Sequence, residues 1–179
     1  MTTLTEFIDG RFVIAGTGSR SFNPEEHTQA AANLAQQVQG NLNKFGDKLV
    51  LMSGGAQGWD AQITIMARQF GVPYVLCLPN KGYLDYYWGR QSPEAMSMLI
   101  EAEYVEYTME DVYNSTSLYL PWPNQMPGYK SRGEHSNFVR NRRMVELADA
   151  FWVFNPASRG TEHCLTHIKK ADKPYKILG

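Results

Sequence analysis

Three short segments of the sequence combine glycine with small polar side chains, each directly after an apolar run. They are residues 16–21, 53–60 and 155–161, and each leads toward a helical pattern. Glycine lets backbone N–H groups approach a ligand closely, and a helix N-terminus favours an anion. If the three segments meet at one sheet edge, their shared chemistry is the binding of a phosphate group.

A basic helical pattern adds a fourth group of candidates. Arg140 lies one turn before Met144, so it can point along the same crevice, where arginine suits phosphate. Arg142 and Arg143 fit a solvated face instead. We take Arg140 and Asp60 as candidate catalytic residues. The residues expected to bind the ligand are Gly16, Thr17, Gly18, Ser19, Arg20, Ser53, Gly54, Gly55, Ala56, Asp60, Arg140, Asn141, Ser158, Gly160 and Thr161.

Asp60 has two interpretations at this stage. Its carboxylate can accept ligand hydroxyls, or it can cap its own helix. Residues 16–18 lack the third glycine of a dinucleotide fingerprint, and no acid ends the second apolar run to hold a ribose. An ordinary NAD-dependent dehydrogenase is therefore disfavoured, and no cofactor is expected.

Histidine and cysteine do not form a recognisable metal or disulfide pattern. His163 and His167 are four residues apart and can share a helix face, but a third ligand is missing from any recognisable position. Cys77 and Cys164 are far apart in the sequence. We predict no metal site and two buried thiols in a reduced protein.

The elements that position these residues follow from the hydrophobic pattern. Buried strands are expected at residues 11–15, 48–52, 74–78, 104–107, 150–154 and 175–178. Helices are expected from residue 23 onward, around 63–70, and at 93–103, 136–149 and 161–171. Apolar strands separated by helices predict a Rossmann-like three-layer α/β fold, with a mostly parallel central sheet and helices on both faces. In such folds the ligand crevice lies at the carboxyl ends of the strands.

The 179 residues suit one domain, residues 1–179, with an irregular aromatic-rich insertion at about 80–135. The aromatic residues of the insertion have two interpretations. They form a lid that stacks on a base, or they form a satellite core or dimer contact.

Charge and hydropathy exclude several classes of protein. There are 17 Lys and Arg against 18 Asp and Glu, a net charge of −1, which disfavours a nucleic acid partner. No apolar run approaches the roughly 20 residues of a membrane-spanning helix, and the N-terminus lacks a secretory pattern. We expect a cytoplasmic protein with no membrane partner.

The order of the motifs resembles the SLOG superfamily, and most closely its YspA and YpsA-like branch. The resemblance rests on residues 18–20, 53–60, 140–144 and 158–161, in that order, and spans residues 12–178 outside the loop at 80–135. The superfamily also includes the DNA-processing protein DprA and the LOG phosphoribohydrolases. It implies a Rossmann-like sheet that binds a nucleotide or nucleotide derivative, and a homodimer or higher homo-oligomer.

One motif departs from the LOG hydrolases, which release a base from a nucleoside 5′-monophosphate. Cys164 occupies the position of their catalytic Glu, and Glu162 is two residues away, a rotation of about 200° on a helix. Asp60 or Glu134 could supply the carboxylate that such hydrolysis needs. The leading hypothesis is a nucleotide-binding module or sensor. The alternatives are a LOG-like hydrolase of an N-glycosidic bond and, with less support from the charge, a single-stranded DNA binder as in DprA.

Overall fold

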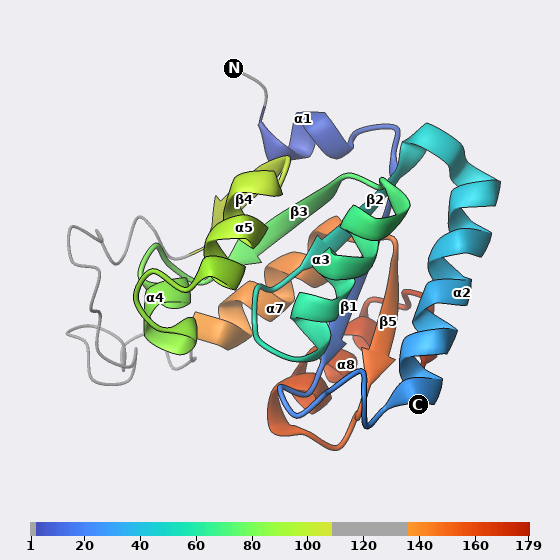
Figure 1. Cartoon of the computed structure of the whole chain (residues 1–179). Helices are drawn as coiled ribbons and strands as arrows, with labels where there is room; N and C mark the ends of the chain where they lie inside the picture. The colour runs from blue at the N-terminus through green and yellow to red at the C-terminus, as the bar shows by residue number, and fades with distance from the viewer. Residues whose placement is uncertain (1–2, 109–135) are drawn as a thin grey trace.

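The computed structural model describes residues 3–108 and 136–179 (Figure 1). The expected substitute Glu134 and the aromatic cluster around Trp122 lie outside these ranges. The strands are β1 Phe12–Gly18, β2 Leu49–Ser53, β3 Tyr74–Leu78, β4 Tyr104–Tyr107, β5 Ala150–Phe154 and β6 Tyr175–Ile177. The helices are α1 Leu4–Ile8, α2 Thr28–Phe45, α3 Trp59–Phe70, α4 Tyr83–Trp88, α5 Pro93–Glu101, α7 Ser136–Leu147 and α8 Arg159–Lys170, with a 3₁₀ turn at Gly46–Lys48.

The six strands form one sheet in the order β4-β3-β2-β1-β5-β6. Every neighbouring pair is parallel, so the predicted α/β fold with a mostly parallel sheet is confirmed. After β4 at one edge, the chain returns to the other side of β1, where Ile14 pairs with Ala150. Strand order therefore reverses at the β1–β5 pair, and a crevice opens at the carboxyl ends of strands where this happens.

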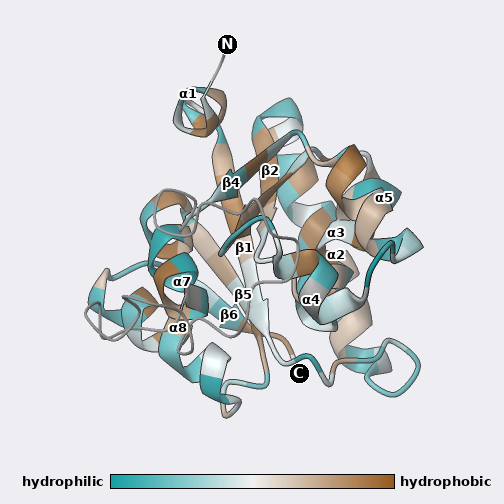
Figure 2. Cartoon of the chain, turned by 90° about the vertical axis from the view of Figure 1, so that its left-hand side faces the viewer, coloured by the Kyte–Doolittle hydropathy of each residue, from teal (hydrophilic) through white to brown (hydrophobic). Residues whose placement is uncertain are grey.

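Helices cover both faces of the sheet, as Figure 2 shows with α7 and α8 on one side and α2, α3 and α5 on the other. Alternate residues of β1 face the two sides: Ile14 packs with Leu34 of α2, and Val13 packs with Val145 of α7. Since the inner strands β1, β2, β3 and β5 are buried on both faces, they read as continuous apolar runs rather than alternating ones, whereas the edge strand β6 is exposed. No helix among residues 3–108 and 136–179 is long and apolar enough to cross a bilayer.

The helix expected from residue 23 begins later, at Thr28, so that boundary was wrong. The side chain of Asn23 accepts the Glu25 N–H at 2.8 Å, and its carbonyl accepts the His27 N–H at 2.8 Å. These bonds close a separate turn before the helix, because an Asn side chain competes with the helical pattern for backbone groups.

The described part of the stretch at about 80–135 has the predicted helix and strand, as α5 and β4, and one helix that was not predicted, α4. Strand β4 pairs with β3 at the edge of the sheet. Helix α1, also unforeseen, begins with a capping box in which Thr3 and Glu6 bond each other's backbone N–H groups.

Candidate functional site

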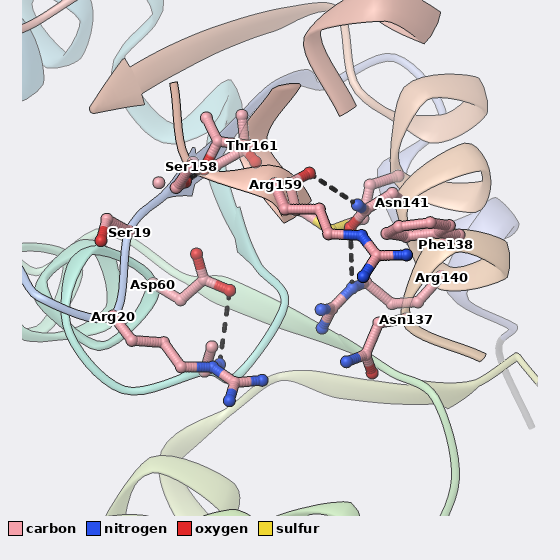
Figure 3. Close-up of a pocket in the computed structure, with 16 residues that line it drawn as sticks. Ser19, Arg20, Asp60, Asn137, Phe138, Arg140, Asn141, Ser158, Arg159 and Thr161 are labelled. Atoms are coloured by element: carbon pink, nitrogen blue, oxygen red, sulfur yellow. Dashed lines mark hydrogen bonds between the residues drawn. The ribbon is translucent and has the colours of Figure 1, made fainter. Parts of the chain in front are cut away.

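A cavity of about 430 Å³ opens at the carboxyl ends of β1 and β5, between the loop after β1 and helix α7 (Figure 3). This is the point where strand order reverses. The residues that line the cavity are Gly16, Thr17, Gly18, Ser19, Arg20, Ala56, Asp60, Asn137, Phe138, Arg140, Asn141, Met144, Ser158, Arg159, Gly160 and Thr161. The three glycine-containing segments therefore meet at one place, together with one face of α7.

All of the predicted ligand-binding residues line this cavity except Ser53, Gly54 and Gly55. These three lie behind it and hold its lining residues. The Ser53 hydroxyl donates to the carbonyl of Asp60 at 2.9 Å and accepts the Gly55 N–H at 3.1 Å. The carbonyl of Gly54 accepts a hydrogen bond from Arg140.

The sequence prediction left out four lining residues: Asn137, Phe138, Met144 and Arg159. Asn137 and Met144 share one face of α7 with Arg140, and Phe138 lies three residues before Asn141, because positions three and four apart on a helix point the same way. That spacing was a usable signal once Arg140 had been placed at the site. Arg159 lies in the sequence between Ser158 and Gly160, both of which were predicted to bind the ligand.

Asp60 is a buried carboxylic acid at the second position of α3, with 6% of its surface exposed. Its Oδ2 atom accepts the Ala56 N–H at 3.3 Å, so it braces the preceding loop, while Figure 3 shows its other oxygen pointing away from that loop into the cavity. Burial raises the pKa of Asp60 to about 6, although Arg140 and the Ala56 N–H act to lower it. The group therefore changes charge close to neutral pH.

Arg140 ties three parts of the site together. Its Nε donates to Asn141 Oδ1 at 3.0 Å and its Nη1 donates to the Gly54 carbonyl, while Asn141 Nδ2 donates to the Gly160 carbonyl at 3.2 Å. The chain of bonds runs from the loop after β2, through α7, to the start of α8. Burial acts to lower the pKa of Arg140, but the neighbouring Tyr83 and Asp60 raise it overall, so the guanidinium stays charged.

The glycines of β1 let helix α3 pack closely against the strand. A Cβ atom on Gly18 would lie 2.6 Å from the ring of Trp59, which is fully buried and donates from Nε1 to the Trp152 carbonyl at 3.2 Å. Gly58 adopts a positive φ of 77°, and a Cβ there would lie 2.6 Å from the carbonyl oxygens of Ser19 and Arg20. The first two loops can therefore touch only because Gly58 has no side chain.

Helix α8 begins at the cavity. Ser158, its N-cap residue, forms no side-chain hydrogen bond to the helix amides among the described residues. Its hydroxyl donates instead to that of Thr161 at 2.6 Å. The positive end of this 12-residue helix is therefore available to a bound anion beside Arg159.

Several other sequence candidates lie away from the cavity lining. Glu162 is exposed on α8, as its rotation from position 164 predicts, and Cys164 is buried. Burial raises the pKa of the Cys164 thiol to about 12, which makes it a poor nucleophile. The ring of His163 stacks on Phe138 at 3.9 Å, and residues 3–108 and 136–179 contain no cluster of three potential metal ligands. Arg143 forms an ion pair with Glu106 at 2.8 Å.

No family model matches the chain, and no curated protein matches it. The fold is similar to that of DNA processing protein A (DprA) from Streptococcus pneumoniae, with a TM-score of 0.61 and 17% identity. That match covers 95% of this chain and 51% of the pneumococcal protein, so the chain spans about half its length.

Two further solved structures share the architecture. DprA from Helicobacter pylori, described for its single-stranded DNA binding mode, has a TM-score of 0.61 and 19% identity, over 98% of this chain and 69% of that one. A structural genomics target, TM1055, has a TM-score of 0.52 and 12% identity, over 92% of this chain and 72% of that one. The chain therefore shares its fold with the two DprA proteins and TM1055, while its place in a YspA-like branch stays a prediction.

Proposed function

We propose that the cavity binds a nucleotide or nucleotide-derived ligand through phosphate, and that the protein acts as a binding module or sensor. The observation that carries this proposal is the start of α8, which opens without a side-chain cap into a cavity lined by three arginines. Arg20, Arg140 and Arg159 face a single carboxylate there, Asp60, which gives the lining a net charge of +2 or more. A net charge of −1 for the whole chain makes this local excess notable.

The start of α8 is the proposed place of the ligand's phosphate, because the amides of Gly160 and Thr161 border the cavity there. The Arg159 guanidinium, 5.9 Å from the centre of the Phe138 ring, belongs to the same lining. The free oxygen of Asp60 lies across the cavity and is an acceptor for a sugar hydroxyl. Phosphate and sugar together favour a nucleotide over a simple inorganic anion. The cavity volume lies within the range of small-molecule sites.

Binding without turnover is the better supported alternative. Asp60 is the single carboxyl group among the described residues of the lining, and one of its oxygens already braces the loop at Ala56. The position of the LOG-type catalytic Glu holds the buried Cys164. Within residues 3–108 and 136–179, Asp60 is the lining carboxyl group that such an enzyme could use, and its pKa of about 6 is the observation in favour of a hydrolase.

A second candidate ligand is single-stranded DNA. It is favoured by the similarity of the fold to the Helicobacter pylori protein that binds it. A nucleotide unit of a DNA strand presents the same phosphate and sugar to the cavity. The two ligands differ in the salt dependence of binding, because a strand that contacts several cations releases several counterions.

The test is calorimetric titration with a panel of ligands, followed by chromatography of the products. The panel contains nucleoside mono-, di- and triphosphates, ADP-ribose, cyclic nucleotides, inorganic phosphate and a thymidine oligonucleotide. Arg159→Ala is compared with Arg68→Ala, a matched variant of an exposed arginine on α3 that pairs with Glu101 at 3.0 Å.

We expect one nucleotide to bind more tightly than inorganic phosphate and to remain intact. Arg159→Ala should weaken its binding about tenfold, since a charged hydrogen bond contributes roughly 1.5–3 kcal/mol, and Arg68→Ala should leave it unchanged. Release of free base would make the protein an enzyme. Equal effects of both variants, or no preference over inorganic phosphate, would reject the site.

A further inference from the structure

Helix α4 places three aromatic side chains behind the cavity, each against a different part of the site. The Arg140 guanidinium lies 5.6 Å from the centre of the Tyr83 ring, and that of Arg20 lies 4.2 Å from the centre of the Tyr87 ring. Trp88 Nε1 donates to the carbonyl of Gly55 at 2.9 Å. None of these three aromatics belongs to the cavity lining, so their effect on a ligand passes through the residues they hold.

Arg20 needs such support more than Arg140 does. It lies on the loop after β1 and is exposed, whereas Arg140 is buried and bonded on two sides. A long exposed side chain samples many rotamers and loses that freedom when it grips a ligand. A guanidinium stacked at 4.2 Å on an aromatic face is already restricted, at a distance well inside the range of a cation–π contact.

The Tyr87 ring is itself fixed. The side chain is half-buried and packs against the main core, and the centre of its ring lies 4.7 Å from the centre of the Tyr83 ring. The side chains of Arg20 and Asn137, two lining residues that come from different segments, act to lower the pKa of the Tyr87 hydroxyl, against the larger effect of burial. Burial raises the pKa of this hydroxyl, so it keeps its proton at neutral pH.

We propose that Tyr87 is a positioning residue that holds Arg20 toward the ligand's phosphate, although Tyr87 does not touch the ligand. This inference rests on the proposed function and deepens it, because it makes Arg20 a pre-oriented second clamp opposite Arg159. The Tyr87 ring supplies the surface on which the Arg20 guanidinium stacks.

The test is a double-mutant cycle measured with ADP-ribose as the probe. The variants are Tyr87→Leu, which keeps apolar volume but removes the aromatic face, Tyr87→Phe, which keeps the face, Arg20→Ala, and Tyr87→Leu combined with Arg20→Ala. Thermal unfolding of each variant shows whether it is folded. We expect Tyr87→Leu to weaken binding about fivefold in the wild-type background and not at all in the Arg20→Ala background. Tyr87→Phe should restore most of the affinity.

A second measurement needs no ligand. Protons on the δ-carbon of Arg20 lie near the face of the Tyr87 ring, so their NMR signals should be shifted upfield in the wild type and in Tyr87→Phe, and normal in Tyr87→Leu. An equal loss of affinity in both backgrounds, or no loss, would overturn the inference. If the wild type shows the NMR shift but does not bind ADP-ribose, Tyr87 does hold Arg20, but the contact is purely structural and its role in phosphate binding is refuted. This result is distinct from a misplaced Tyr87, for which the NMR shift itself would be absent.

Discussion

Asp60 provides the most direct test of the site because its ionisation links stability to ligand binding. The pKa of this carboxyl is about 6 in the folded protein, against an ordinary value of 3.8 for an aspartate side chain. The folded chain therefore holds its proton over a pH range where the unfolded chain has lost it. The free energy of unfolding must then fall as pH rises from about 4 to above 6, and the whole of this decrease is present above pH 7.

The size of this decrease follows from the pKa difference of about two units. At about 1.4 kcal/mol per unit, ionised Asp60 lowers the free energy of unfolding by about 3 kcal/mol above pH 7. About 2 kcal/mol of that change falls between pH 4.5 and 7.5. Asp60→Asn has no such titration, and its amide oxygen can still accept the Ala56 N–H.

The assay is urea unfolding, followed by tryptophan fluorescence, at several pH values between 4.5 and 7.5. The stability of the wild type relative to Asp60→Asn should decline by about 2 kcal/mol across this range. Glu26→Gln, which changes an exposed carboxylate, serves as the control and should run parallel to the wild type. Parallel curves for the wild type and Asp60→Asn would refute the raised pKa.

The same proton should control anion affinity. When Asp60 is neutral, the three arginines of the lining are unopposed, so ADP-ribose should bind several-fold more tightly to the wild type below pH 6 than at pH 7.5. ADP-ribose suits this test because its phosphodiester groups do not titrate near pH 6, as a monophosphate does. The pH dependence should be absent in Asp60→Asn.

Three other predictions concern residues around the site. Gly18→Ala should destabilise the protein by about 1–3 kcal/mol, because its Cβ meets the Trp59 ring, whereas Gly40→Ala, with open space on α2, should stabilise it by about 0.5–1 kcal/mol; chemical denaturation compares them. Lys173→Met should cost roughly 2 kcal/mol in the same assay, since its ammonium group donates to the Glu146 carbonyl near the end of α7 at 3.1 Å and to the Ala148 carbonyl just after it at 2.6 Å. A loss no larger than that of Lys176→Met would contradict this account. Cys164→Ala should leave ADP-ribose affinity unchanged in calorimetry, and a marked loss would place the thiol at the ligand.

The sequence was most informative where burial leaves few options. The strands at Tyr74–Leu78 and Ala150–Phe154 have the predicted bounds, because continuous apolar runs have no stable place except the centre of a covered parallel sheet. The meeting of the three loops followed from the rule that parallel strands point the same way. What the sequence could not provide was the placement of α7 against α8, where the Phe138 ring stacks on that of His163.

Local sequence patterns were poor guides to structure where two patterns competed, or where segments distant in the sequence meet in the fold. Asn23 and Pro24 suggested a helix start, but the side chain of Asn23 closes its own turn first. The glycines of residues 16–18 suggested a ligand, yet Gly18 also makes room for Trp59, a contact that depends on how closely α3 packs on β1. The aromatic residues of α4 suggested an irregular segment. Their contacts with Arg20 and Gly55 are visible only in three dimensions.

The central position of β1 has a consequence for when the protein becomes functional during synthesis. One side of β1 pairs with β2, which follows soon after it, but the other side waits for β5, and the Val13 N–H bonds to the carboxylate of Asp149, 136 residues later. Closing such a long loop is slow, and the emerging chain lacks half of the cavity until α7 and α8 have left the ribosome. A bound ligand would therefore mark a completely assembled molecule, and it would select against truncated or partly folded chains.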